Sequence, residues 1–152
     1  MEKQEIVELL ALHEEAISKL YSVIGKRFIE YQNFWEKLAE EEMYHAGSIR
    51  KLLLRIQDGL GIVNSEKFSF SKLSESLADI QGAIGRVEEP DFTLQDALSL
   101  SLSIEESLLE DKYFDVFVGN CAEVKQVQYC LEAAVKDHCQ RIRQMAARVK
   151  DI

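Results

Sequence analysis

The stretch Glu42-Met43-Tyr44-His45 interrupts a series of apolar residues that follow one another at helical spacing. The full series is Trp35, Leu38, Glu42, His45, Ile49, Leu52 and Ile56. Because steps of three and four keep residues on one side of a helix, Glu42 and His45 should point into a core. A carboxylate in a core needs a compensating partner. Glu-x-x-His on facing helices holds the ions of carboxylate-bridged di-iron bundles, so the stretch predicts a bundle helix that binds metal.

Three further series of apolar residues are interrupted in the same way. They are Leu10, Glu14, Ile17, Tyr21, Ile24, Phe28, then Leu102, Glu106, Leu109, Tyr113, Val116, and finally Val124, Leu131, Val135, His138, Ile142, Met145, Val149. Each interruption falls near the middle of a predicted helix, so antiparallel packing would bring the polar side chains to one level. The candidate metal ligands are Glu14, Glu42, His45, Glu106 and His138.

The length and composition indicate one globular domain over residues 1–152, with ample apolar material for a core. The formal charge of -9 disfavours binding to nucleic acid or to an anionic membrane surface, and is compatible with attracting cations. Because the sequence has neither a signal-peptide pattern nor an apolar run long enough to span a bilayer, we expect a cytoplasmic protein.

The pattern of helices and turns predicts an all-α fold, an antiparallel four-helix bundle. The expected helices cover residues 2–29, 33–57, 94–118 and 121–150. Asn33 is a plausible N-cap, Thr93 with Asp96 marks another helix start, and Gly59, Gly61 and the Gly119-Asn120 turn mark helix ends. A long crossover over residues 58–93 contains a short amphipathic helix with Leu73, Leu77, Ile80, Ile84 and Val87 on one face.

The two predicted hairpins are similar to each other in sequence. Leu38, His45, Ile49 and Arg50 match Leu131, His138, Ile142 and Arg143 at identical offsets. Glu14 precedes Tyr21 by seven residues, as Glu106 precedes Tyr113. The one mismatch among the candidate ligands is Val135, which stands where the repeat would place a counterpart of Glu42.

The chain resembles the ferritin-like superfamily, and within it the rubrerythrin-like erythrin domains. The resemblance covers nearly the whole chain and is carried by residues 38–45, Glu14 with Leu20-Tyr21, Glu106 with Tyr113, and His138. It implies a ferritin-like four-helix bundle that holds two irons with Glu14, Glu42, His45, Glu106 and His138. Val135 departs from the family, which has a bridging glutamate there. The resemblance therefore leaves two alternatives, a site with one ion and a site with two weakly held ions.

The resemblance also implies a function and partners. The implied function is the reduction of hydrogen peroxide or dioxygen, or the oxidation of ferrous iron, at a non-haem iron centre. The implied assembly is a homodimer. Manganese and zinc are alternatives to iron. The rubredoxin-like cysteine module is absent from the sequence, so reduction requires an external electron donor. The alternative is a metal-free, degenerate bundle with a structural or interaction role.

The neighbouring residues have simpler interpretations. We expect His13 at the rim of the core and Tyr21 and Tyr113 in the core as aromatic packing residues. Glu15, Glu40, Glu41, Glu105 and Glu110 are expected to be solvated charges. Cys121, Cys130 and Cys139 lie nine residues apart on one predicted helix, where they cannot bridge to one another, so reduced thiols are expected.

Overall fold

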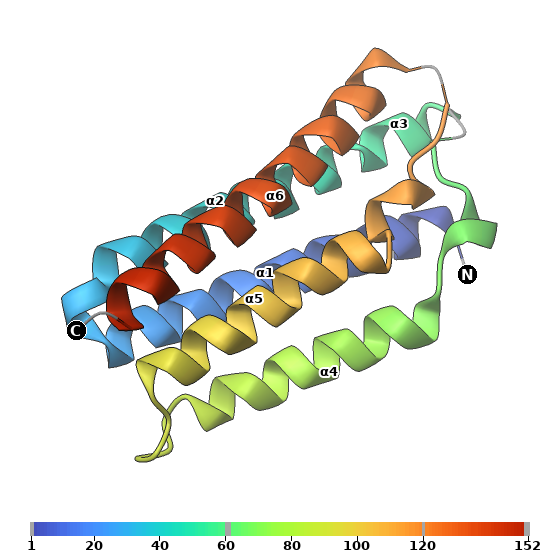
Figure 1. Cartoon of the computed structure of the whole chain (residues 1–152). Helices are drawn as coiled ribbons and strands as arrows, with labels where there is room; N and C mark the ends of the chain where they lie inside the picture. Colours follow the sequence, from blue (N-terminus) through green and yellow to red (C-terminus); the bar gives the residue numbers. More distant parts are fainter. Residues whose placement is uncertain (1, 60–61, 120, 151–152) are drawn as a thin grey trace.

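A computed structural model describes residues 2–59, 62–119 and 121–150 (Figure 1). The six α-helices described are α1 (Lys3–Arg27), α2 (Gln32–Lys51), α3 (Leu53–Gln57), α4 (Phe70–Arg86), α5 (Leu94–Glu110) and α6 (Ala122–Lys150). The 3₁₀ turns are η1 (Ile29–Tyr31), η2 (Ser65–Lys67) and η3 (Tyr113–Val116). These residues contain no strand, only an isolated bridge between Val63 and Phe117. The predicted all-α class is therefore confirmed.

The long helices lie roughly along one another in a bundle (Figure 1). α1 and α2 form one antiparallel hairpin, and α5 and α6 form a second. α4 packs on α1 and runs along the lower edge of the bundle in Figure 1, where it connects the first hairpin to the second along the chain. Because α4 carries the chain back along the bundle, α5 runs in the same direction as α2. None of the described helices is long and apolar enough to cross a membrane.

The crossover helix is longer than the sequence suggested. α4 has 17 residues, as many as α5, so five long helices build the described part of the bundle instead of the four expected. The predicted apolar face is correct, since Leu73, Ile80 and Val87 are buried. The amphipathic crossover thus adds a full-length helix to the bundle.

Three of the four interrupted series lie in the core as predicted. On α1, α2 and α6 the apolar members are buried or packed against the core, and Glu14, Glu42 and His138 are buried with them. α1 and α2 approach closely near their connection, where a Cβ on Gly25 would lie 3.1 Å from Cβ of Trp35. Tyr21 and Trp35 pack there with ring centroids 5.7 Å apart. These three series of residues therefore face one common interior.

Several predicted helix bounds were wrong. The segment 33–57 divides into α2 and α3 at Leu52, where the backbone N–H of Leu52 bonds to the carbonyl of Ile49, one residue closer than in an α-helix. Asn33 lies inside the first turn of α2 and does not cap it. The segment 94–118 stops at Glu110, because Lys112 adopts a left-handed conformation with φ of 52°. Gly61 and Asn120, expected in turns, lie outside the described residues.

The start of α5 is capped as the sequence predicted. The Thr93 hydroxyl accepts a hydrogen bond from the backbone N–H of Asp96 at 3.1 Å. The Asp96 carboxylate accepts one from the backbone N–H of Thr93 at 2.9 Å. These reciprocal bonds form a capping box, which satisfies two backbone donors and fixes where α5 begins.

Replacing Thr93→Ala should lower the free energy of unfolding by about 1 kcal/mol, because the first turn of α5 loses its side-chain acceptor. Urea unfolding followed by circular dichroism measures the change. Thr93→Ser keeps the hydroxyl and should remain close to the wild type. Equal stability of the alanine variant would show that the capping box does not stabilise α5.

Candidate metal centre

Five ligand-type side chains from four helices meet in the interior. Glu14 comes from α1, Glu42 and His45 from α2, Glu105 from α5 and His138 from α6. We call these five residues the carboxylate–histidine cluster. Four of them are buried, and the side chain of His45 keeps 12% of its surface exposed. Four of the five residues predicted from the sequence are therefore brought together.

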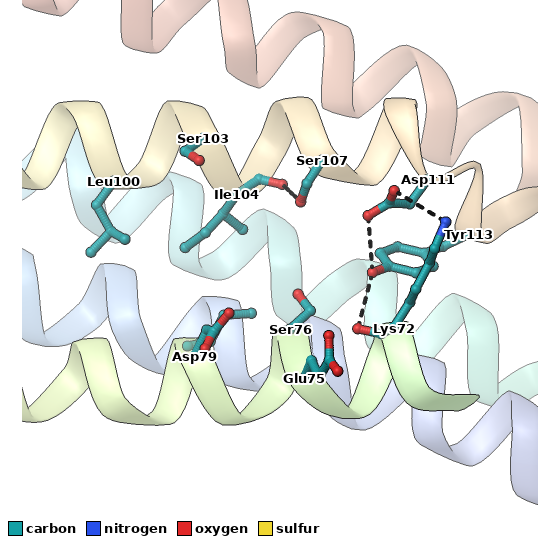
Figure 2. A pocket seen from close by; sticks show the side chains of 11 residues that line it. Lys72, Glu75, Ser76, Asp79, Leu100, Ser103, Ile104, Ser107, Asp111 and Tyr113 are labelled. Atoms are coloured by element: carbon teal, nitrogen blue, oxygen red, sulfur yellow. Dashed lines mark hydrogen bonds and ion pairs between the residues drawn. The ribbon is translucent and has the colours of Figure 1, made fainter. Parts of the chain in front are cut away.

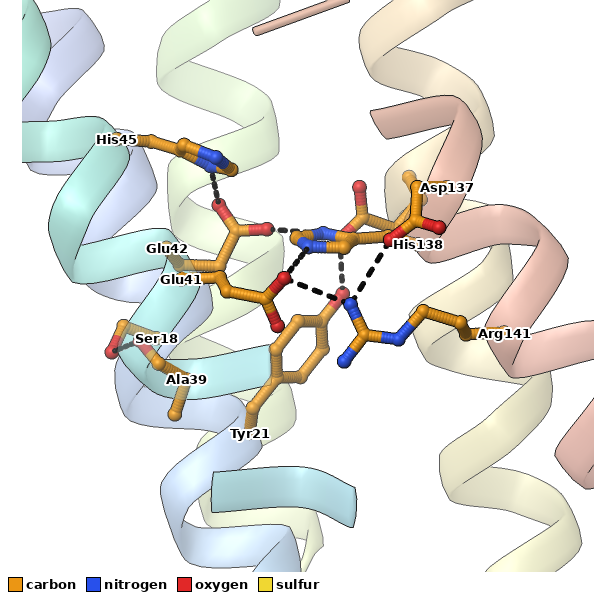
Figure 3. A network of polar contacts seen from close by, with 10 residues as sticks. Ser18, Tyr21, Ala39, Glu41, Glu42, His45, Asp137, His138 and Arg141 are labelled. Atoms are coloured by element: carbon orange, nitrogen blue, oxygen red, sulfur yellow. Dashed lines mark hydrogen bonds and ion pairs between the residues drawn. The ribbon is translucent and has the colours of Figure 1, made fainter. Parts of the chain in front are cut away.

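Glu42 lies at the middle of the cluster, and its two oxygens face different histidines. Oε2 is 3.4 Å from Nδ1 of His45, and Oε1 is 2.8 Å from Nδ1 of His138 (Figure 3). The two imidazole rings have centroids 5.7 Å apart. One carboxylate thus contacts both histidines of the site.

Glu105 completes the cluster from α5. Its Oε1 is 3.2 Å from Nδ1 of His138 and accepts a hydrogen bond of 2.7 Å from the hydroxyl of Tyr21. Its Oε2 is buried and has no hydrogen-bond partner in the described chain, and the same is true of Oε2 of Glu14. Two carboxylate oxygens in the core are therefore free to bind a cation.

The cluster contains two overlapping sets of potential ligands. In the first, which we call the first ligand group, Glu14, Glu42 and His45 each offer an atom within 4.8 Å of the others. The second ligand group, with the same spacing, is Glu42, Glu105 and His138. Because Glu42 belongs to both groups, it is placed to bridge two ions.

Glu106 lies elsewhere, against the prediction that it would point into the core. Its side chain is 40% exposed and forms an ion pair of 3.0 Å with Arg143. Glu105, expected to be a solvated charge, is fully buried in its place. The predicted series was anchored on Tyr113 and Val116, but both lie in η3, after the helix has ended. Because both are buried without following helical periodicity, a series drawn through them places the inward-facing position of α5 one residue too far along the chain, at Glu106 instead of Glu105.

The correct register has a signal in the sequence. The capping box starts α5 at Leu94, and steps of four and three from there reach Leu98, Ser101, Glu105 and Leu108. All five positions are buried. Counting from the cap would thus have selected Glu105.

Burial and mutual repulsion shape the protonation of the carboxylates. Burial and the charge of Glu42 raise the pKa of Glu14 well above its ordinary value. The same two causes raise the pKa of Glu105 to about 7, although its bonds with His138 and Tyr21 act in the opposite direction. Burial also acts to raise the pKa of Glu42, but hydrogen bonds with Glu14, His138 and His45 outweigh it and lower that pKa. The negative charge of the cluster is therefore concentrated on Glu42.

His138 carries the compensating positive charge in the metal-free protein. Burial alone would lower the pKa of His138, but hydrogen bonds to Glu105 and Glu42 and their charges raise it to about 10. An imidazolium between two carboxylates therefore offsets part of their charge. Any metal ion that uses His138 must displace this proton.

His13 and Tyr113 contact each other and lie outside the carboxylate–histidine cluster. Nε2 of His13 is 2.8 Å from the hydroxyl of Ser76 on α4, and its ring packs edge-on against Tyr113 at 5.7 Å. Burial lowers the pKa of His13 to about 4, so the ring is neutral. Ser76 and Tyr113 also line a cavity of about 350 Å³ between α4 and α5 (Figure 2). His13 is thus a buried histidine at the rim of the core, as expected.

The remaining candidates take the following places. Val135 is buried one turn before His138 on the inner face of α6. Cys121, Cys130 and Cys139 are free thiols, of which only Cys139 is buried. Glu15 and Glu41, expected to be solvated, are half-buried and pair with Arg50 and Arg141.

The metal-free protein should become more stable as pH falls from 8.5 to 7. Folded His138 keeps its proton up to a pKa of about 10, whereas an unfolded histidine loses it near 6.5, so the contribution is complete below 6.5 and lost as pH rises through 10. Glu14 and Glu105 act in the same direction at lower pH, while His13 opposes them below 6.5. Urea unfolding with a chelator present measures the trend. A His138→Gln variant should lose it, and a flat wild-type profile would contradict the assignment.

Comparison of the chain with protein-family models, with curated proteins and with solved structures finds no match.

Proposed function

We propose that the protein binds one or two divalent metal ions through the carboxylate–histidine cluster. The observation that carries the proposal is the position of Glu42, whose Oε2 faces His45 in the first ligand group and whose Oε1 faces His138 in the second. A carboxylate that offers one oxygen to each side is the arrangement of a bridging ligand. The proposal therefore includes two ion positions that share Glu42.

The donor set fits a transition metal. Three carboxylates and two imidazoles suit iron, manganese or zinc, which accept both oxygen and nitrogen ligands. The buried, unpartnered oxygens of Glu14 and Glu105 further support the proposal, because unsatisfied polar atoms in a core are costly. A bound cation would satisfy them and would also offset the repulsion that raises the pKa values of Glu14 and Glu105.

We further propose iron as the physiological metal and a function of the rubrerythrin type. The proposal rests on the sequence resemblance, in which α1, α2, α5 and α6 correspond to the four helices of a ferritin-like bundle and α4 to its crossover. Bound iron would supply electrons to hydrogen peroxide or dioxygen, and an external donor would restore them. The proposal places the protein in the cytoplasm as a homodimer.

The chain's own residues would serve this chemistry in three ways. Glu14, Glu42, His45, Glu105 and His138 bind the ions. The hydroxyl of Tyr21 donates to Glu105 and holds that carboxylate in a fixed orientation. The apolar residues next to the cluster on each helix exclude bulk water, which strengthens every electrostatic interaction inside.

A second candidate is a metal-free bundle with a structural or interaction role. It is favoured by the ion pair of His138 with Glu42 and by its hydrogen bond with Glu105, which already offset part of the charge without an ion. The two candidates differ in one simple measurement, the metal content of protein purified without chelators.

Elemental analysis after reconstitution with ferrous iron or Mn²⁺ should find bound metal in the wild type. Glu42→Gln should remove nearly all of it, because both ligand groups lose their shared member. Glu105→Gln should weaken the second ligand group, whereas its neighbour Glu106→Gln is a matched control and should bind as the wild type does. A wild type without metal, with thermal stability unchanged on adding it, would favour the metal-free bundle. Equal effects of the two neighbouring substitutions would disprove the placement of Glu105.

Val135→Glu should strengthen metal binding, because it adds a carboxylate one turn before His138 at the position that lacks one. Without metal the same change should cost roughly 1–3 kcal/mol, since it buries a further carboxylate. The bound metal per chain and the urea unfolding midpoint with chelator measure the two effects. Leu131→Glu is the control, because it buries a carboxylate one turn further from His138 and should destabilise without binding metal. No gain in metal together with no loss of stability would mean that residue 135 does not face the interior.

A further inference from the structure

The two nitrogens of the His138 ring face different surroundings. Nδ1 faces Glu42 and Glu105 inside the cluster. Nε2 points the other way, toward Glu41 on α2, whose Oε1 lies 3.8 Å away (Figure 3). That distance is too long for a hydrogen bond, and this buried nitrogen has no hydrogen-bond partner among the described residues.

Glu41 is held in place from the other side by Arg141. The guanidinium Nη1 of Arg141 donates to Oε1 of Glu41 at 2.9 Å and to Asp137 at 3.1 Å. The second oxygen of Glu41 is buried and also lacks a hydrogen-bond partner within the described chain. A buried ring nitrogen and a carboxylate with an unused acceptor thus lie close together without being bonded.

The same three residues are spaced like metal ligands, but a further ion between them is disfavoured. Glu41, Asp137 and His138 each offer an atom within 4.8 Å of the others. Arg141 already places a permanent positive charge on both carboxylates. A metal ion would have to displace that guanidinium, so Glu41 is better placed to act on the imidazole.

The chemistry of an imidazole gives Glu41 a role. A neutral ring carries one proton, so when Nδ1 binds a metal ion through its lone pair, the proton must be on Nε2. A carboxylate that accepts this N–H fixes the tautomer and the ring orientation and makes the metal-bound nitrogen more basic. Glu41 is the carboxylate on that side of the ring.

We propose that Glu41 is a positioning residue that accepts a hydrogen bond from Nε2–H of His138 when Nδ1 binds the metal, with Arg141 holding Glu41 in place. The contact requires the 3.8 Å separation to close to hydrogen-bond distance. This proposal rests on the proposed metal-binding function, and it assigns to Glu41 a role that its half-exposed position did not suggest.

The test uses Zn²⁺ as a diamagnetic probe with the full-length protein. Glu41→Ala should weaken Zn²⁺ binding by about 10- to 100-fold. Glu41→Gln retains an acceptor oxygen without the charge, and should restore part of the affinity. Glu40→Ala removes an exposed carboxylate from the neighbouring position on α2 and should bind as the wild type does.

A second readout reports on the hydrogen bond itself. In the Zn²⁺-loaded wild type, nitrogen-detected NMR of the histidine rings should show His138 with metal on Nδ1 and a slowly exchanging proton on Nε2. In Glu41→Ala that proton should exchange much faster, while Glu40→Ala leaves it unchanged. A purely structural role for Glu41 would alter stability without selectively affecting this proton.

The outcomes separate this proposal from the function on which it rests. If the wild type binds Zn²⁺ and Glu41→Ala matches it in affinity and in proton exchange, the role of Glu41 is disproved and metal binding stands. If the wild type binds no Zn²⁺, both proposals fail. If Glu41→Ala does not fold, Glu41→Gln is measured with the same two readouts. Weaker Zn²⁺ binding and faster proton exchange than in the wild type would support the proposal, and unchanged values would overturn it.

Discussion

The carboxylate of Glu42 imposes the main constraint on this bundle. It is almost completely buried, and a charge removed from water is tolerated only when the surrounding groups compensate it. The compensation comes from separate helices, because His138 approaches from α6, Glu14 from α1, and His45 from the next turn of α2 itself. The helices must therefore meet at this level, and the Glu41–Arg141 ion pair joins α2 to α6 at the same place.

The cluster can satisfy this constraint in two ways. In the metal-free protein a proton on His138 and protons shared among Glu14 and Glu105 reduce the charge, which is why the pKa values of all three rise. A divalent ion would replace those protons and would bind the carboxylate oxygens of Glu14 and Glu105 that have no hydrogen-bond partner. Acid and metal are thus expected to compete for the same core, and the shared position of Glu42 is what makes the metal a reasonable occupant.

Much of the fold could be predicted because its signal is local. The series on α1, α2 and α6 keep helical spacing along their whole length, so Glu14, Glu42 and His138 were placed correctly in the core. The capping box of Thr93 and Asp96 could also be predicted from the sequence. The error on α5 arose because Tyr113 and Val116 are buried by tertiary packing in η3, where helical periodicity no longer applies. The pairing of Glu41 with Arg141 was missed for a related reason, since contacts between residues distant in sequence leave no local pattern.

The unequal exposure of the two histidines has a consequence for kinetics. His45 keeps 12% of its side-chain surface in contact with solvent, and exposed Tyr44 packs edge-on against it, whereas His138 keeps 1% and is enclosed by α2, α5 and α6. An ion beside His45 would therefore have a short path to water and a short residence time. An ion beside His138 would leave only when the helices separate locally, so its release would follow the opening rate of the bundle. Two ions that share one carboxylate would then exchange with solution on very different timescales.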